Sequence, residues 1–494
     1  MSADRRESSS WRSLPTAVAF DPRWESAATD GLSRLSRMKW AFWVLVVTLL
    51  ITVAVRGDAP EDVLGAALIV VAGLAPAYLW LQQGARTLPI MSAVAAMHIL
   101  YFAFPLISNH PELFLYDPGE RLAAAATVVA FLVAATVACS MASSSFRFRE
   151  TASEIEGDRL GGALVAGLLA GLVFHYLTLG GYLGFLGEWY GIMRAFALNL
   201  LLAVTFLVGV LKGKGALNGA FGMACVSGVL LNVMASWASL FLVGGIILWA
   251  VFVLGYVLGS RRVPIKEFLP VFLLAFVLHA GKSEMREKYW IDGAQSDPVS
   301  MLQMPERIVE WIGAGVAELT SEQESAPSIL ERASLMQMLL RAQEMSPDPV
   351  PFLGGETYAQ IPRMLVPRVL DPDKPASQAG MDLLNIRYGI LTAEGAQRTA
   401  VGWGLLSEAY ANFGVPGVLM CGVLLGVFIG FITGWTSGAP PLSARTMLGI
   451  VVTAVSVSLE ADSASYITSL FQAAIAVFVL SHLLRALGQR LRSS

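Results

Sequence analysis

Two cations and one aromatic residue stand at a spacing that suits phosphate binding. Lys282, Arg286 and Tyr289 stand at positions i, i+4 and i+7. A helix that continues past the apolar run at 267–281 therefore carries all three on one face. Charged donors form strong hydrogen bonds with phosphate oxygens, so this face is a candidate phosphate site. In the alternative interpretation, the side chains only extend to the membrane surface and anchor the end of a helix.

A carboxylate follows at the beginning of a later apolar run. Glu408 and Asn412 are four residues apart, with Tyr410 between them. An ionised carboxylate at this depth is costly unless it is paired or faces water, so Glu408 is a functional candidate, with an arginine or lysine as its expected partner. Glu460 and Asp462 pose the same question at the end of the next apolar run.

The stretch between these groups carries further cations. Residues 328–342 predict an amphipathic helix with Arg332 near its start. Beyond it, Arg363, Arg368 and Lys374 lie on a backbone that prolines stiffen. These prolines forbid a regular helix and favour an extended, turned path. They are Pro362, Pro367, Pro372 and Pro375. The alternative is a solvated loop with scattered charges.

Several other chemistries lack the residues they need. Segment 282–401 has no histidine and no cysteine, which removes a zinc site, a cysteine nucleophile and a histidine base from it. No nucleotide-binding loop is present. An acidic group at 58–62 could hold a divalent ion, although a solvated turn is the simpler interpretation. The three cysteines lie in apolar runs without CxxC spacing, which predicts no disulfide framework: Cys139, Cys225 and Cys421.

The composition indicates what positions these groups. Of 494 residues, 55% are hydrophobic and 14% charged, and the net charge of −3 excludes a nucleic-acid binder that depends on a basic face. Runs of about 20 apolar residues predict membrane-spanning helices. We expect an all-α polytopic membrane protein with about 12 of them. Their cores are 40–55, 63–81, 88–107, 122–142, 161–179, 195–211, 216–235, 238–259, 267–281, 415–436, 444–460 and 465–487.

The basic residues of the short loops predict the orientation. Every second loop is basic, as the positive-inside rule requires when both termini are cytoplasmic. This divides the chain into a cytoplasmic tail (1–37), nine spans (38–281), one large outer loop (282–401), and three spans with a cytoplasmic C-terminus (402–494). We expect a bacterial inner membrane with the large loop in the periplasm. The basic loop residues are Arg86, Arg147, Arg149, Arg159, Lys212, Lys214, Arg261, Arg262, Lys266 and Arg445.

An ordered set of short motifs resembles the O-antigen polymerase (Wzy-type) family, which polymerises oligosaccharide repeat units. The set is Lys282-x3-Arg286, Arg332, Ile361-Pro362-Arg363 with Asp373-Lys374-Pro375, and Ser407-Glu408-Ala409-Tyr410-x-Asn412-Phe413-Gly414-x2-Gly417. The layout also matches, with one large late loop and a few spans after it. Residues 1 to about 270 match only in hydrophobic layout.

The resemblance implies a glycosyltransferase-C-like enzyme that moves a glycan from undecaprenyl diphosphate to a sugar hydroxyl. Under it, Arg286, Arg332 and Arg363 bind the diphosphate, and Lys282 and Lys374 assist. Glu408 orients or deprotonates the acceptor, or holds an arginine. Tyr289, Arg368, Tyr410 and Asn412 are further substrate contacts. No metal or other cofactor is required. The partners are the lipid-linked oligosaccharides and the bilayer, and a chain-length-determining protein is a further candidate.

Three other functions stay open. An O-antigen ligase transfers finished glycan to another acceptor, but we associate that family with a histidine in the large loop. A metal-dependent glycosyltransferase would use the acidic group at 58–62. A transporter or flippase with about 12 spans typically shows internal repeats and ionisable or helix-breaking features in the middle of the membrane. The sequence shows no internal repeat, and its candidate chemistry gathers in one outer loop.

Overall fold

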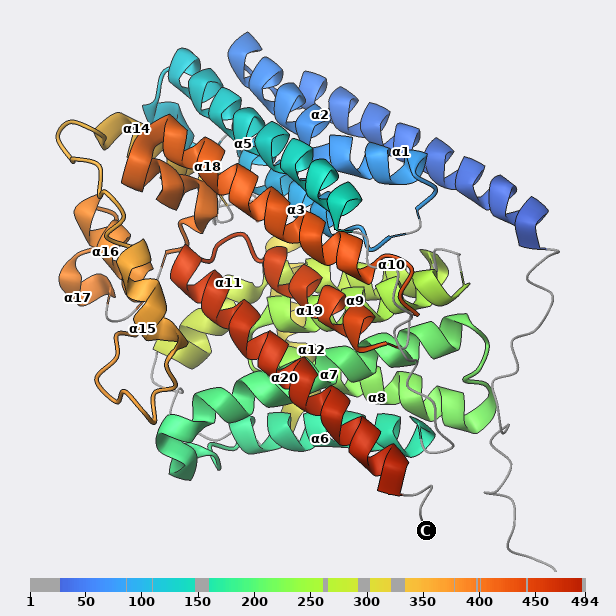
Figure 1. Cartoon of the computed structure of the whole chain (residues 1–494). Coiled ribbons are helices and arrows are strands. Elements are labelled where there is room, and N and C mark those ends of the chain that lie inside the picture. The colour runs from blue at the N-terminus through green and yellow to red at the C-terminus, as the bar shows by residue number, and fades with distance from the viewer. Residues whose placement is uncertain are drawn as a thin grey trace, which may run out of the picture.

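The computed structural model is helical throughout the residues that it describes. These residues are 27–85, 87–108, 110–146, 160–260, 265–291, 303–320, 334–376, 378–396, 399, 401–440 and 443–490. Long helices run roughly side by side, and short helices gather at one end of them (Figure 1). The expectation of an all-α polytopic membrane protein is confirmed at this level.

Eight helices within the described ranges are long and apolar enough to cross a membrane. A ninth candidate is a pair, α10 (Ile265–Ala280) and α11 (Lys282–Arg286) with the π-helix η5 (Glu287–Ile291), bent by 61°. The eight are α1 (Ala27–Arg56, apolar from Met38), α2 (Pro60–Gln82), α5 (Pro118–Ser145), α6 (Leu160–Leu179), η4 with α7 (Gly184–Trp189 and Tyr190–Gly213), α8 (Gly219–Ala238), α9 (Leu242–Ser260) and α18 (Gly404–Thr436).

The other three expected spans coincide with shorter apolar helices. The first, Ile90–Leu106, consists of α3 (Ile90–His98), the π-helix η2 (Ile99–Ala103) and α4 (Phe104–Leu106). The others are α19 (Ala444–Ser456) and the part Ser463–Val479 of α20 (Ser463–Arg490). Since a spanning helix needs roughly 20 apolar residues, length alone does not show twelve spans.

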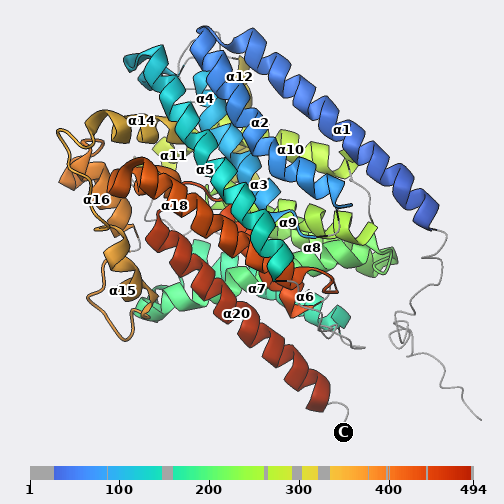
Figure 2. The ribbon, with the colours of Figure 1, turned by 45° about the horizontal axis from the view of Figure 1, so that its top comes forward.

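Glycines on one helix face allow the closest packing in the molecule. α18 lies along α5 in both views (Figures 1 and 2), with Gly422, Gly426, Gly430 and Gly434 on the contact. A Cβ atom at Gly426 would lie 2.2 Å from the carbonyl oxygen of Ala135. α7 and α9 pack in the same way through Gly209, Gly213, Gly255 and Gly259. Small residues at every fourth position let membrane helices approach backbone to backbone.

The helices form two packed groups with a shared partner. One group contains α1, α2, α3 and α5 with α18, and the other contains α6 to α10 with α12 (Met304–Thr320). α19 packs on both α3 and α7, and α20 packs on α7 and α19. The C-terminal helices therefore join the two groups.

The long apolar stretch 216–259 is a hairpin, as the sequence predicts. α8 ends at Ala238 and α9 begins at Leu242. Leu240 in the turn has a φ of 61°, a left-handed conformation that is unusual for a residue other than glycine.

The segment between α12 and α18 folds into short helices at one end of the bundle (Figures 1 and 2). The helix predicted over 328–342 is described only from Leu335, as α14 (Leu335–Met345), whose first turn the Ser334 hydroxyl caps. Then come the 3-10 helix η8 (Tyr358–Gln360), α15 (Ile361–Leu365), α16 (Ala379–Arg387) and α17 (Ala393–Ala396).

The prediction that prolines forbid a helix was wrong at α15. Pro362 occupies the first turn of this short helix, where a proline is tolerated because its missing N–H would have no partner in the helix. The next proline, Pro367, follows the end of the helix at Leu365. The path from there to Pro375 is turned, as expected.

Candidate functional site

A break in α18 organises the candidate site. Gly414 has a φ of 65° inside the helix, and Pro416 has no N–H to donate to the carbonyl oxygen of Asn412. Two carbonyl oxygens are thereby released from the helix. Leu353 N donates to Ala411 O and Gly354 N donates to Asn412 O, each at 3.1 Å. The loop 353–357 thus docks on the broken helix through backbone hydrogen bonds.

The Asn412 side chain completes this docking. Its Oδ1 atom accepts from Gly355 N at 3.0 Å, and its Nδ2 atom donates to the Thr357 hydroxyl and to Glu408 O, each at 2.9 Å. Both Asn412 and Thr357 are fully buried. The amide expected to contact substrate therefore has protein partners on both of its polar atoms, and it positions the loop 353–357.

Glu408 is fully buried and has no basic partner among the described residues. Its Oε2 atom accepts from Ser463 N at 2.6 Å and from the Ser463 hydroxyl at 2.7 Å. Its Oε1 atom has no donor within hydrogen-bond geometry in the described part of the chain, although Thr357 and Tyr358 lie close by. The expected arginine or lysine partner is not found among the described residues, where the beginning of α20 supplies the donors instead.

Two further carboxylates surround the beginning of α20. Asp462 Oδ1 accepts from Ser465 N at 2.9 Å and caps α20. Its Oδ2 atom lies 2.3 Å from the position that a Cβ atom on Gly380 of α16 would take. Burial, followed by the nearby charge of Asp462, raises the pKa of Asp382. Glu460 accepts from the Tyr101 hydroxyl at 3.2 Å. Acidic groups therefore concentrate at this junction.

The predicted cations Arg363, Arg368 and Lys374 hold their own loop together. Arg363 donates to both oxygens of Asp371, at 2.6 and 3.0 Å, and this guanidinium lowers the pKa of the Asp371 carboxyl. Lys374 Nζ donates to the carbonyl oxygens of Met364 and Val366. Burial, and then the charge of Arg368, lowers the pKa of Lys374.

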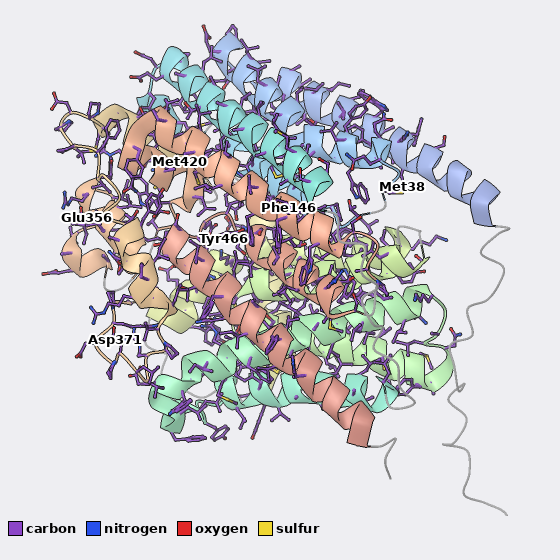
Figure 3. The ribbon with its side chains drawn as sticks, viewed as in Figure 1. Met38, Phe146, Glu356, Asp371, Met420 and Tyr466 are labelled. Carbon is purple, nitrogen blue, oxygen red and sulfur yellow. The ribbon has the colours of Figure 1, made fainter. Side chains whose placement is uncertain are left out.

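Arg368 ties the same loop to the region before α7. It donates to the carbonyl oxygens of Pro372 and Pro375 and lies 3.4 Å from the Glu188 carboxylate. Asp371 lies at the edge of the molecule, whereas Tyr466 near the beginning of α20 lies toward its middle (Figure 3). α15, which carries Arg363, packs against α20, so the basic loop and Glu408 adjoin the same helix.

Arg286 and Tyr289 lie beside the α8–α9 turn. Arg286 donates to Leu240 O at 3.2 Å, and its guanidinium lies 5.9 Å from the centre of the Phe241 ring. The Tyr289 hydroxyl donates to Glu310 in α12 at 2.6 Å, and Arg307 stacks on the Tyr289 ring. The bend after Ala280 and the π-helix η5 interrupt the single helical face that the spacing predicts.

Lys282 begins α11 and is partly buried. Tyr410 packs edge-to-face on Phe352, with ring centres 6.2 Å apart. Arg332 lies outside the described residues.

Within the acidic group at 58–62, Asp58 is exposed, as a solvated turn predicts, but Asp62 is buried and paired. Asp62 is 4% exposed, and Arg121 donates to both of its oxygens at 2.8 Å. Arg121 also donates to the carbonyl oxygens of Leu113 and Tyr116. No group of three or more potential metal ligands occurs among the described residues.

Sequence reasoning missed several of the residues that build these contacts. Thr357, Ser463 and Arg307 lack a local signal, since each acts on a residue far away in the chain. Arg121 had one: it stands at the beginning of an apolar run, where an unpaired arginine would be costly.

No protein-family model, curated protein or solved structure matches this chain.

Proposed function

We propose that this protein is a membrane glycosyltransferase that polymerises lipid-linked oligosaccharides. Its donor is a glycan on a polyprenyl diphosphate such as undecaprenyl diphosphate, and its acceptor is a sugar hydroxyl of a lipid-linked repeat unit. The short motifs and the late large loop support the family resemblance. The proposal includes twelve spans, cytoplasmic termini in a bacterial inner membrane and a periplasmic site.

One observation carries the proposal: the buried Glu408 carboxylate without a basic partner in the described chain. Burying an ionised group costs free energy that a cation or several hydrogen bonds normally offset. Here Ser463 donates to one oxygen, and no group of the described chain meets hydrogen-bond geometry at the other. A carboxylate kept this way is suited to accept a proton, because proton binding relieves its burial.

The reaction then divides between the carboxylate and the cations. The acceptor hydroxyl oxygen attacks the anomeric carbon, its proton passes to Glu408, and the bond from that carbon to the diphosphate oxygen breaks. The leaving diphosphate keeps the electron pair, and guanidinium groups stabilise its negative charge. The glycan is one repeat unit longer, and the polyprenyl diphosphate is released.

Among the described arginines, Arg363 is the best placed for this role. Its side chain is 50% exposed, and α15 adjoins α20, which holds Glu408 through Ser463. Asp371 shields the guanidinium in the resting state, so diphosphate must displace or join that carboxylate. Arg286, Arg332, Arg368, Lys282 and Lys374 complete the proposed cationic set, with Tyr289 and Tyr410 as further substrate contacts.

Asn412 has a supporting role in this scheme. It holds Gly355 and Thr357 against Glu408, so it acts by positioning the loop.

The test is genetic. Deleting the gene and separating the surface glycan by length should remove the long-chain ladder and retain single repeat units. The full-length gene supplied in trans should restore the ladder. Loss of all glycan, including the single unit, would indicate export or an earlier step, and an unchanged ladder would refute the proposal.

A further inference from the structure

Helix α12 has one face that is buried against the membrane helices. Trp311 is fully buried and Ile308 is 4% exposed, and the helix packs on α10, α8 and α11. A Cβ on Gly315 would lie 2.0 Å from Val277 O of α10. This backbone contact is as close as those between the spanning helices, so α12 is an integral part of the bundle.

A second face of α12 is apolar and uncovered in the described structure. Val309, Val316 and Leu319 are 67%, 48% and 46% exposed, and Ile312 between them is half-buried. The spacing i, i+3, i+7 and i+10 places the four on one stripe of the helix. We call these four residues the α12 stripe. In water such a stripe would cost free energy in proportion to its apolar area.

Two contacts of α12 show where this helix lies in the bundle. Near its beginning, Arg307 donates to Ala238 O in the α8–α9 turn at 3.4 Å. About two turns further on, Gly315 meets Gly281, which directly follows the end of α10. α12 therefore lies beside the end of α8 and packs on α10. The exposed side chains of α10 include Phe272 and Phe276, at 54% and 46%.

Charged residues occupy the remaining side of α12. On a helical wheel Glu306 and Glu310 lie about 100° or more from the middle of the stripe. Glu310 receives hydrogen bonds from Tyr289 and Lys288. A helix with one packed, one apolar and one charged side is typical of the membrane interface.

We propose that α12 lies at the bilayer interface on the outer side of the membrane, with the α12 stripe among the lipid acyl chains. The occupant is the bilayer, because α12 packs on α10, whose exposed Phe272 and Phe276 a bilayer would already cover, and because Glu306 and Glu310 lie on a different side of α12 from the stripe. Segment 282–401 is then not one continuous aqueous loop. Its first part returns to the membrane, and only the part from about 334 extends away from it.

Spin labels on single cysteines test this in proteoliposomes, with the three native cysteines replaced by alanine. Val309→Cys and Val316→Cys report on the stripe. Phe272→Cys on α10 is the lipid-facing reference, and Leu370→Cys, 76% exposed on the basic loop, is an apolar residue expected in water. Collision rates with oxygen, which concentrates in lipid, and with a water-soluble nickel chelate are compared at each position.

We expect the ratio of oxygen to nickel collision rates at Val309 and Val316 to resemble that at Phe272 and to exceed that at Leu370 several-fold. Ratios like that of Leu370 would place the stripe in water and overturn the proposal. Low rates with both reagents would show that protein covers the stripe, and would overturn it equally. The readout requires no glycan transfer, so it stands or falls separately from the proposed reaction.

Discussion

Asp62 and Glu408 are both buried carboxylates, but their hydrogen-bond partners differ. Arg121 neutralises Asp62 with two hydrogen bonds and uses its other nitrogen for two carbonyl oxygens. Among the described residues, Glu408 receives its hydrogen bonds from Ser463 and has no basic contact. Asp62 lies near the beginning of α2 and Glu408 near the beginning of α18.

The contrast separates a structural charge from a chemical one. A buried ion pair with all its donors used fixes two helices and has nothing left to exchange with a substrate. A buried carboxylate with one oxygen uncommitted is costly to keep, and a protein gains from it only through binding or proton transfer. Asp62 is therefore a structural charge, and under the proposed function Glu408 is the chemical one.

The largest expected effect is on the structural pair. Replacing Arg121 with leucine leaves the Asp62 charge buried without a partner, which costs about 3–5 kcal/mol. The apparent Tm in detergent should fall strongly. In the matched double variant Asp62→Leu, Arg121→Leu, no charge is stranded and much of the loss should return. A double variant no better than the single one would show that the pair contributes little beyond packing.

A smaller loss is expected where the loop docks on α18. Asn412→Ala leaves Gly355 N–H without its acceptor and Thr357 without its donor, at a cost of about 1–3 kcal/mol. Limited proteolysis of the loop 353–357 should accelerate and glycan elongation should fall together. Elongation lost with the loop still protected would instead make Asn412 a direct substrate contact.

The acidic junction predicts a dependence on pH. Burial and the Asp462 charge raise the pKa of Asp382, so the folded protein binds a proton there more tightly than the unfolded chain. An ionised Asp382 therefore lowers the free energy of unfolding. This cost is absent well below the ordinary pKa of 3.8, develops as pH rises through the raised pKa, and is complete above it. Asp382→Asn should therefore stabilise the protein near neutral pH.

Thermal unfolding of Asp382→Asn beside the parent protein checks the sign. The gain in Tm should be larger at about pH 7.5 than at about pH 4.5. An equal gain in Tm at both pH values would show that the charge of Asp382 is not the cause.

The smallest effect on stability is expected in the basic loop. Arg363 and Asp371 form an exposed pair, and such pairs contribute little to the free energy of unfolding. Arg363→Gln should leave Tm nearly unchanged and shorten the glycan ladder. Asp371→Asn is the matched control, since it breaks the same pair and keeps the guanidinium. Equal shortening in both variants would assign the effect to the loop conformation.

Most helices were predictable, and the partners of the charged residues were not. Apolar runs locate the long spanning helices, but they miss α12 (Met304–Thr320), which lies in the segment expected as one outer loop. The Gly422–Gly434 repeat could have predicted a close helix contact for α18. The donors to Glu408 come from Ser463, 55 positions later in the chain. Arg121 similarly reaches Asp62 across 59 positions. Hydropathy places such groups at a membrane end, but only the packing of α2 on α5 and of α18 on α20 decides which of them meet.

The sequence alone could have predicted the release of the Ala411 and Asn412 carbonyl oxygens. A glycine and a proline two residues apart in an apolar helix predict a break, and freed carbonyl oxygens require donors. That the donors are Leu353 and Gly354 follows only from the fold.

Glu408→Gln tests the central claim most directly. Glutamine keeps the shape and an oxygen that can accept from Ser463, but it cannot take the acceptor proton. Thermal stability in detergent and glycan chain length should be measured on the same variant. The account predicts a Tm equal to or above that of the parent protein with the long-chain ladder abolished. A full ladder at normal protein levels, or a collapse in stability like that of Arg121→Leu, would contradict it.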